Sequence, residues 1–330
     1  MKDLKEISIN AIEGFNIGQA QNQTAATGCT AVICEKGAVC GVDVRGGSPG
    51  TRDTDALNPV NNRKEVHAVL LAGGSTFGLD AAGGVMRFLE EKGIGRDVGV
   101  TVVPNVCGAI LFDLKCGDHR VRPDAPMGYE ACIQAFSGQA WKSGNYGAGT
   151  GATVGTSLGI HRAMKGGIGS SALCYDKLKV GAILAVNCVG DIYDSHCGQV
   201  LAGLRTEDGK GLADSESAIL EGYIRREDMF SGNTIIGVIL TNARLTKAQA
   251  TKLAAVSQNG IARAVRPANT IYDGDSLFAM CTGEVEATLD AVGVLACRAV
   301  EKAILNAVRS AESYGGYPAY KSFSQARLQP

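Results

Sequence analysis

Short glycine clusters set against apolar runs are the feature that most constrains the fold of this chain. The sequence has 44 glycines in 330 residues, and many stand in clusters such as Gly73-Gly74 and Gly147-Ala-Gly149-Thr-Gly151. Glycine adopts backbone conformations that other residues avoid, and it lets two backbones approach closely. Because these clusters lie beside apolar segments and form no polar linker, we expect one compact domain, residues 1–330, with many tight turns.

The apolar segments predict strands paired by hairpins, with helices between them. Residues 29–34 and 38–44 predict one hairpin, and residues 170–175 and 180–187 predict a second. Further strands are predicted at 66–72, 98–103, 109–114 and 234–241, and helices at 77–91, 246–264 and 284–311. This order favours antiparallel or mixed sheets covered by helices.

The charge pattern gives no sign of a nucleic-acid or membrane partner. Lys and Arg number 32 against 33 Asp and Glu, the net charge is −1, and the basic residues are scattered. No apolar stretch approaches the length of a membrane span, and the amino terminus lacks the apolar segment of a secretion signal. We therefore expect a cytoplasmic protein.

Cysteine and histidine are not arranged as in disulfide frameworks or metal sites. The eleven cysteines are dispersed, odd in number and without a Cys-x-x-Cys pair, a pattern that favours reduced, buried thiols. The four histidines share no metal-ligand spacing. We expect neither a metal nor an organic cofactor.

A polar turn that leads directly into an apolar run marks the first candidate for chemistry. Ser231-Gly-Asn233 precedes Thr234, and Thr234 begins the run Thr-Ile-Ile-Gly-Val-Ile-Leu. If the Asn233–Thr234 bond is cut, Thr234 carries both a hydroxyl and a free α-amine. That amine titrates at about pH 8 and can act as the base for the hydroxyl. The ordinary alternative is a loop that enters a core strand.

Three further segments place polar side chains next to apolar residues. Asp273 and Asp275 flank a glycine, so their carboxylates either lie together near a nucleophile or belong to a common Asp-Gly turn. Lys165 precedes a glycine pair, and it either approaches an active centre or lies in a solvated loop. Asn187 ends an apolar run, where its amide can donate to an oxyanion or simply follow a strand.

The glycine motif at residues 147–155 raises a dinucleotide-binding alternative. Gly147-x-Gly149-x-x-Ala152 matches the phosphate-binding fingerprint, which should follow a strand and open a helix. The preceding residues, 139–146, make a poor strand, and no acidic residue ends a second strand roughly 20 residues later. This alternative is therefore disfavoured.

Six segments taken together resemble one family of enzymes. They are Pro49-Gly-Thr-Arg-Asp-Thr54, Val66-His-Ala-Val-Leu-Leu-Ala-Gly-Gly-Ser-Thr-Phe-Gly-Leu-Asp80-Ala-Ala, Gly147-Ala-Gly-Thr-Gly-Ala-Thr-Val-Gly155, Met164-Lys-Gly-Gly167, Asn233-Thr234 and Asp273-Gly-Asp275. In this order they are similar to the self-processing aminopeptidases, which include the L-aminopeptidase/D-esterase (DmpA) group, the β-peptidyl aminopeptidases and the nylon-oligomer hydrolases. The resemblance runs over residues 10–315.

The resemblance implies a fold, an assembly and a processing event. The fold is a four-layer α-β-β-α sandwich of the α/β (α+β) class, shared with the ornithine acetyltransferases. The assembly is a homo-oligomer, usually a tetramer. The processing event is self-cleavage between Asn233 and Thr234, which would leave residues 1–233 and 234–330 associated and Thr234 as the nucleophile.

Carried over position by position, the resemblance also assigns roles to the other candidates. Asp273 and Asp275 match the pair that lies near the nucleophile. Lys165 matches a site lysine of the nylon-oligomer hydrolases, and Asn187 matches an oxyanion donor. The chain departs from the family pattern at Phe112, where many relatives carry a tyrosine, so one hydroxyl donor to the oxyanion or substrate is missing.

The sequence therefore predicts an aminopeptidase or amide hydrolase that acts on short peptides, peptide amides or small oligoamides through an acyl-threonine intermediate. Two alternatives stay open. One is acyl transfer of the ornithine acetyltransferase type, in which an amine replaces water. The other is an uncut homologue without catalytic activity.

Overall fold

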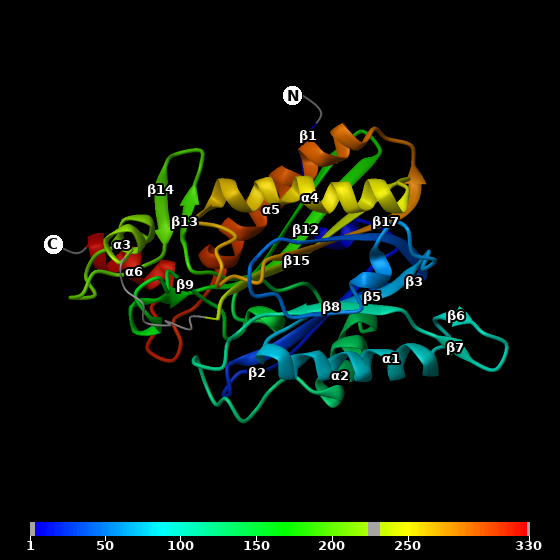
Figure 1. Ribbon diagram of the computed structural model, residues 1–330, viewed down its shortest axis with the longest axis horizontal. Helices are drawn as coiled ribbons and strands as arrows, with labels where there is room; N and C mark the ends of the chain where they lie inside the picture. The colour runs from blue at the N-terminus through cyan, green and yellow to red at the C-terminus, as the bar shows by residue number, and fades with distance from the viewer. Residues whose placement is uncertain (1–3, 224–231, 329–330) are drawn as a thin grey trace.

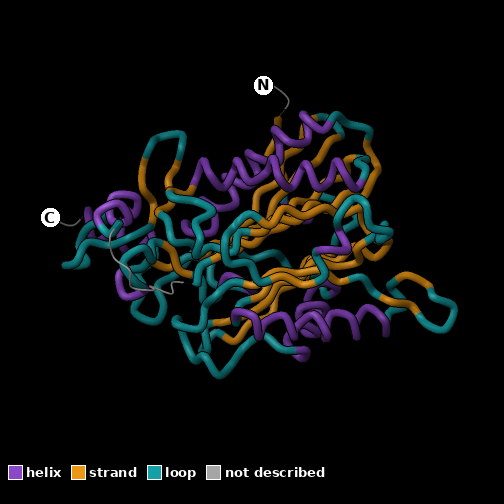
Figure 2. The backbone as a smooth tube through the Cα atoms, viewed as in Figure 1, coloured by secondary structure: helices purple, strands orange, loops and turns teal. Residues whose placement is uncertain are grey.

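The computed structural model of the chain describes residues 4–223 and 232–328. Ser231, which begins the polar turn expected before Thr234, lies outside the described residues. Two β-sheets are stacked in the middle of the molecule, and helices lie on both outer sides (Figure 1). The same layers are visible when the backbone is coloured by secondary structure (Figure 2).

The first sheet is mixed and contains the strand that begins at Thr234. Its strand order is β1-β11-β12-β15-β17-β3, in which β15 and β17 are parallel and the other neighbours are antiparallel. The strands are β1 (Leu4–Ile7), β11 (Gly167–Tyr175), β12 (Leu178–Asn187), β15 (Thr234–Ala243), β17 (Ser276–Val285) and β3 (Thr27–Val44).

The second sheet shares β3 with the first. Its amino-terminal part pairs with β2 and β5, and beyond β5 lie β8 and β4. In this second sheet β5 and β8 are parallel, and the pairs β2–β3, β3–β5 and β4–β8 are antiparallel. The further strands are β2 (Asn16–Asn22), β4 (Thr51–Arg52), β5 (Val66–Ala72) and β8 (Val106–Ile110).

The continuity of β3 shows that the hairpin predicted for residues 29–34 and 38–44 is wrong. The chain does not reverse at Glu35-Lys36-Gly37. Instead, the register of β3 against β5 shifts between Ile33 and Ala38, and both sides of the shift keep β5 as a partner. Gly37 has a φ of 74°, which allows a bulge of this kind. An apolar pattern broken by a glycine turn is the same for a hairpin and for a bulged strand, so the sequence alone did not separate them.

Three buried clusters fill the spaces between four layers. Helices α4 (Lys247–Ala264) and α5 (Leu289–Ser310) pack on the first sheet, and α1 (Ala81–Glu91) and α2 (Ala125–Phe136) pack on the second. Along β12, Leu184 contributes to the cluster with α4 and α5, and its neighbour Ile183 contributes to the cluster between the sheets. The third cluster joins β3 and β5 to α1 and α2. The four-layer α-β-β-α prediction is confirmed.

Other local predictions are confirmed with shifted ends. The hairpin of β11 and β12 turns at Asp176, which has a φ of 54°. Helix α4 begins directly after its N-cap Thr246, and the predicted capping box of Thr246 with Gln249 is present. The helix predicted from 284 begins only after Thr288, because residues up to Val285 continue β17. The strand predicted at 98–103 is reduced to Val102–Val103.

Smaller elements complete the described chain. The remaining strands are β6 (Arg96–Asp97), β7 (Val102–Val103), β9 (Thr153–Val154), β10 (Met164–Lys165), β13 (Asp191–Asp194), β14 (Gln199–Ala202) and β16 (Val265–Arg266), and the remaining helices are α3 (Ser215–Glu221) and α6 (Tyr320–Leu328). None of the helices within residues 4–223 and 232–328 combines the length and the apolar character that a membrane crossing requires.

Candidate active site

Thr234 is the first residue of β15, a central strand of the first sheet. It is buried, with only 3% of its surface exposed, and Asn233 directly precedes it in the sequence. The register of β15 against β12 sets Thr234 directly opposite Asn187. Because residues that face each other across antiparallel strands share one side of the sheet, the two side chains are neighbours.

The Thr234 hydroxyl lies against the peptide bond that precedes it. Its Oγ1 donates a hydrogen bond to the carbonyl oxygen of Asn233. The same carbonyl oxygen accepts a hydrogen bond from the backbone N–H of Gly274, at 2.9 Å. A hydroxyl oxygen therefore adjoins a carbonyl group whose oxygen already has a donor, which is the arrangement that acyl transfer requires.

The rest of Asn233 is also held by hydrogen bonds. Its backbone N–H donates to the Tyr272 carbonyl at 3.2 Å, and Asn233 forms a parallel β-bridge with Asp273. Its side-chain Nδ2 donates to Thr156 Oγ1 at 2.7 Å. Asn233 is 2% exposed, so the peptide bond before Thr234 is fixed from three directions.

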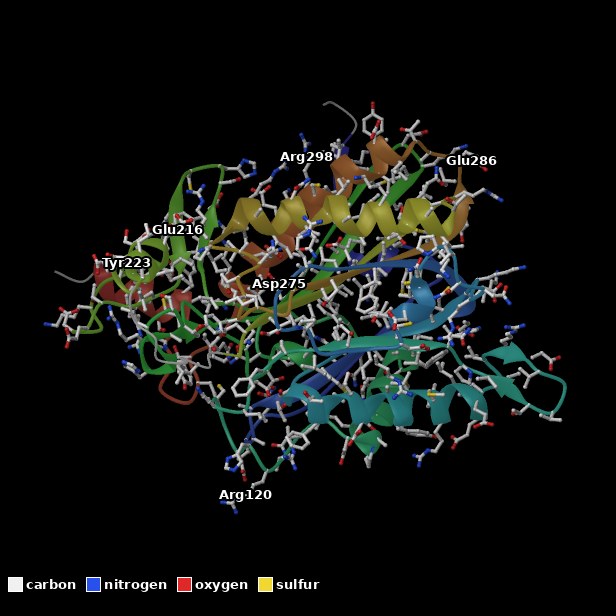
Figure 3. The ribbon with its side chains drawn as sticks, in the orientation of Figure 1. Arg120, Glu216, Tyr223, Asp275, Glu286 and Arg298 are labelled. Carbon is white, nitrogen blue, oxygen red and sulfur yellow. The ribbon has the colours of Figure 1, made fainter. Side chains whose placement is uncertain are left out.

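Asp273 and Asp275 lie beside this peptide bond, and both accept backbone N–H groups. Asp275 accepts from Ile235 at 2.7 Å and from Asn269 at 3.1 Å. Asp273 accepts from Val189 at 3.2 Å, and also from the Thr270 N–H and hydroxyl. In Figure 3 the labelled Asp275 lies in the interior, whereas the labelled Glu286 lies at the edge of the molecule.

Burial raises the pKa of both carboxyl groups above the ordinary value of 3.8. The pKa of Asp275 is raised most, first by burial and then by the neighbouring Asp273. Burial also raises the pKa of Asp273, although its bonds from Thr270 and Val189 oppose the shift. Because two adjacent buried carboxylates resist carrying two charges, the pair favours holding a proton that it can exchange with a nearby group.

Asn187 reaches the site from the end of β12. Its Oδ1 accepts the Thr153 N–H at 2.9 Å, and its Nδ2 donates to the Phe112 carbonyl at 3.2 Å. The Phe112 ring lies against the backbone just before Asn233, since a Cβ built on Gly232 would come 2.7 Å from the ring. Phe112 therefore borders the backbone that leads into Asn233 and Thr234.

Lys165 is fully buried and adjoins the site through one intervening strand. It lies in β10 opposite Thr153 of β9, whose N–H binds Asn187. Its Nζ donates to the Ala152 carbonyl at 2.7 Å. Burial lowers the pKa of Lys165 to about 8, an effect that nearby Cys116 and Asp113 oppose. The solvated-loop interpretation of this lysine is wrong, because none of its surface is exposed.

Three residues of the region escaped the sequence prediction. Thr156 holds the Asn233 side chain, and Gly274 supplies the N–H to the Asn233 carbonyl. Asp113 is buried, accepts from the Thr27 hydroxyl and the Gly74 N–H, and has its pKa raised to about 6 by burial. An acid following an apolar run was a visible signal for Asp113, whereas nothing local distinguishes Thr156.

The glycine motif at 147–155 serves close packing in this fold. Gly147–Gly149 form a short 3-10 turn, and no α-helix starts there, so the dinucleotide alternative lacks the helix that it needs. A Cβ on Gly149 would lie 2.1 Å from the Ile168 nitrogen, and one on Gly155 would lie 2.0 Å from the Gly203 backbone. Only glycine permits these approaches.

The chain matches a family model and curated proteins over most of its length. The model of peptidase family S58 matches residues 8–321. An uncharacterized aminopeptidase of Mycobacterium leprae (strain TN) is 40% identical, and the match covers 95% of this chain and 93% of the relative. A 6-aminohexanoate-oligomer endohydrolase of Kocuria sp. (strain KY2) is 29% identical, and the match covers 83% of this chain and 74% of the relative.

Solved structures show the same fold at low sequence identity. The L-aminopeptidase D-Ala-esterase/amidase from Ochrobactrum anthropi superposes with a TM-score of 0.70 at 19% identity, covering 98% of this chain and 93% of that one. It is described as a prototype for the serine aminopeptidases and a new variant of the Ntn-hydrolase fold.

Proposed function

Because this chain belongs to peptidase family S58, we propose that it is a self-processing amide hydrolase with Thr234 as its nucleophile. Family membership confirms the resemblance predicted from the six sequence segments and makes the protein a peptidase or amidohydrolase. The observation that carries the proposal is the contact of the Thr234 hydroxyl with the Asn233 carbonyl, whose oxygen also accepts the Gly274 N–H.

Maturation begins at this carbonyl group. Thr234 Oγ1 attacks the carbonyl carbon of Asn233. The Gly274 N–H, whose nitrogen lies 2.9 Å from the Asn233 carbonyl oxygen, donates to that oxygen as it becomes negatively charged. The C–N bond breaks, the Thr234 nitrogen gains a proton, and an ester is left on the Thr234 oxygen. The Asp273/Asp275 pair carries the proton between hydroxyl and nitrogen. Water then hydrolyses the ester and leaves residues 1–233 and 234–330.

Turnover uses the amine that maturation releases. The α-amine of Thr234 titrates at about pH 8 and accepts the proton of the hydroxyl while the oxygen attacks a substrate carbonyl. Asn187 is the proposed oxyanion donor, and the buried ammonium of Lys165 supplies positive charge near the developing negative charge. The leaving amine departs, and water hydrolyses the acyl-threonine ester. This route requires no metal or organic cofactor.

The names of the relatives point to the substrate class. One relative is named an aminopeptidase and another a 6-aminohexanoate-oligomer endohydrolase. Both names describe hydrolysis of an amide bond. We therefore propose short peptides, peptide amides or small oligoamides as the substrates of this chain.

Thr234→Ala and Thr234→Ser test the proposal as a matched pair. Alanine removes the hydroxyl, so we expect neither cleavage on denaturing electrophoresis nor hydrolysis of aminoacyl p-nitroanilides. Serine keeps a hydroxyl and an α-amine, so both reactions should persist. A Thr234→Ala protein that is cut and active like the natural chain would refute the proposal, and an uncut, inactive natural chain would favour the homologue without activity.

Compartment and assembly remain predictions from the sequence and the family. The eleven cysteines are all free and nine are buried, which suits a reducing compartment such as the cytoplasm. We propose a homo-oligomer, and light scattering on the purified protein measures its mass directly.

A further inference from the structure

Asn233 occupies a site that binds the N–H, the carbonyl oxygen and the side-chain amide nitrogen of an acyl residue. Its N–H donates to the Tyr272 carbonyl at 3.2 Å, and its own carbonyl accepts the Gly274 N–H at 2.9 Å. Its side-chain amide donates to Thr156 Oγ1 at 2.7 Å. The Thr156 N–H donates in turn to the Val189 carbonyl at 3.1 Å, and Thr156 is 1% exposed, so the position of its hydroxyl is fixed.

Self-cleavage and turnover transfer an acyl group to the same atom. In self-cleavage Asn233 is the acyl residue: a bond forms from its carbonyl carbon to Thr234 Oγ1, and the C–N bond breaks. In turnover the first residue of the substrate undergoes the same exchange, and the leaving amine takes a proton. Thr234 is fixed at the start of β15, so both acyl groups approach it within the same surroundings.

We infer that the site of Asn233 in the uncut chain is the acyl subsite of the mature enzyme, and that it selects substrates whose released residue is asparagine. This inference rests on the proposed function, because it requires Thr234 to be the nucleophile. The Tyr272 carbonyl receives the substrate amine, the Gly274 N–H receives the substrate carbonyl, and Thr156 receives the side-chain amide.

Substrates whose side chains have the shape of asparagine isolate the contribution of the Thr156 hydrogen bond to selectivity. Leucine matches the shape of asparagine but has no donor, so it leaves the buried Thr156 hydroxyl without this partner. Aspartate has the same shape but brings a charged carboxylate into the place of Asn233, which is only 2% exposed, and burying an unpaired charge is costly. A site built to bind a polar group discriminates against an analogue that lacks it.

The subsite becomes free for substrate when the new carboxyl terminus at Asn233 leaves it after self-cleavage. Cleavage turns the Asn233 carbonyl into a carboxylate beside the buried Asp273 and Asp275. Because the Asp273/Asp275 pair holds a proton and one negative charge, the new carboxylate puts a second negative charge into a buried site, and the two charges repel each other. The new terminus is therefore driven out, and the hydrogen-bonding groups of Tyr272, Gly274 and Thr156 become available to substrate.

The experiment compares asparaginyl, leucyl and aspartyl p-nitroanilides with the purified, processed natural enzyme. We expect kcat/KM for the asparaginyl substrate to exceed that for the leucyl substrate by about tenfold, the effect of one buried hydrogen bond. Thr156→Val should bring this ratio close to one, and Thr156→Ser should preserve it. Thr101→Val, a matched change at an exposed position far along the chain, should leave the ratio as it is.

The outcomes distinguish a failure of the subsite inference from a failure of the proposed function. If the enzyme is cut at Asn233–Thr234 and active, but hydrolyses leucyl at least as well as asparaginyl substrate, the subsite inference is overturned and the proposed function stands. If the chain is neither cut nor active on any substrate, the proposed function fails, and the inference fails with it. If Thr156→Val blocks self-cleavage, the substrate ratio of the natural enzyme alone decides.

Discussion

Gly274→Ala perturbs the contact between the Thr234 hydroxyl and the peptide bond that we propose it attacks. A Cβ at this position would lie 2.8 Å from Thr234 Oγ1 and 2.6 Å from the Ser48 carbonyl oxygen. Both distances are shorter than carbon–oxygen contacts allow, so either the hydroxyl or the backbone must move. Overpacking of this kind costs about 1–3 kcal/mol of unfolding free energy. Displacing the N–H that donates to the Asn233 carbonyl lowers the cleavage rate about 10²–10³-fold.

The assay follows self-cleavage over time by denaturing electrophoresis, alongside urea unfolding. Gly83→Ala is the matched control, because a Cβ on Gly83 in α1 meets nothing within 4 Å. Alanine is the better helix former, so this control should cleave normally and gain up to about 1 kcal/mol of stability. If Gly274→Ala cleaves as fast as Gly83→Ala, the Gly274 N–H does not stabilise the oxyanion and our account of maturation is wrong.

Three further predictions address the acids and the thiols. The Asp275 carboxylate accepts two backbone N–H groups, and Asp275→Asn leaves only one acceptor oxygen, so the unfolding free energy should fall by about 1–3 kcal/mol and self-cleavage should slow. A variant with the same unfolding free energy and the same cleavage rate as the natural chain would contradict this. Burial raises the pKa of Asp113 to about 6 from 3.8, so the folded state holds its proton more tightly than the unfolded state does. The free energy of unfolding that this proton contributes is fully present below about pH 4 and is lost as the pH rises past about 6. Between pH 4 and 7, the unfolding free energy of the natural chain in urea should therefore fall by up to about 3 kcal/mol more than that of Asp113→Asn. Parallel pH profiles of the two proteins would exclude a raised pKa. Without reductant, a thiol reagent should react with all eleven cysteines in denaturant and mainly with the exposed Cys197 in the native protein. Fewer than eleven reactive thiols in denaturant would reveal a disulfide.

The layers of the fold could be predicted, whereas the path of one strand could not. Apolar runs and the capping box at Thr246 gave β15 and α4 nearly at their observed ends, because these signals are local. The sequence at residues 35–37 fits both a hairpin turn and a bulge, and only the pairing of β3 with β5 on both sides decides for the bulge. The start of α5 was missed because Glu284 and Val285 continue β17, where strand pairing outweighs their helical pattern.

The candidate site was predicted in part, and mainly through the family resemblance. Register brings Asn187 opposite Thr234, and the structure places Asp273 and Asp275 beside the same peptide bond. Thr156 lies far from Asn233 in sequence, and its hydrogen bond depends on tertiary structure that no local pattern encodes.

Intact-mass measurement with amino-terminal sequencing of the purified, active protein tests the central claim most directly. Our account predicts two polypeptides, residues 1–233 and 234–330, the second of which begins Thr-Ile-Ile-Gly. A single full-length polypeptide that hydrolyses substrate at an undiminished rate would contradict it, because Thr234 would then have no free α-amine to act as its base.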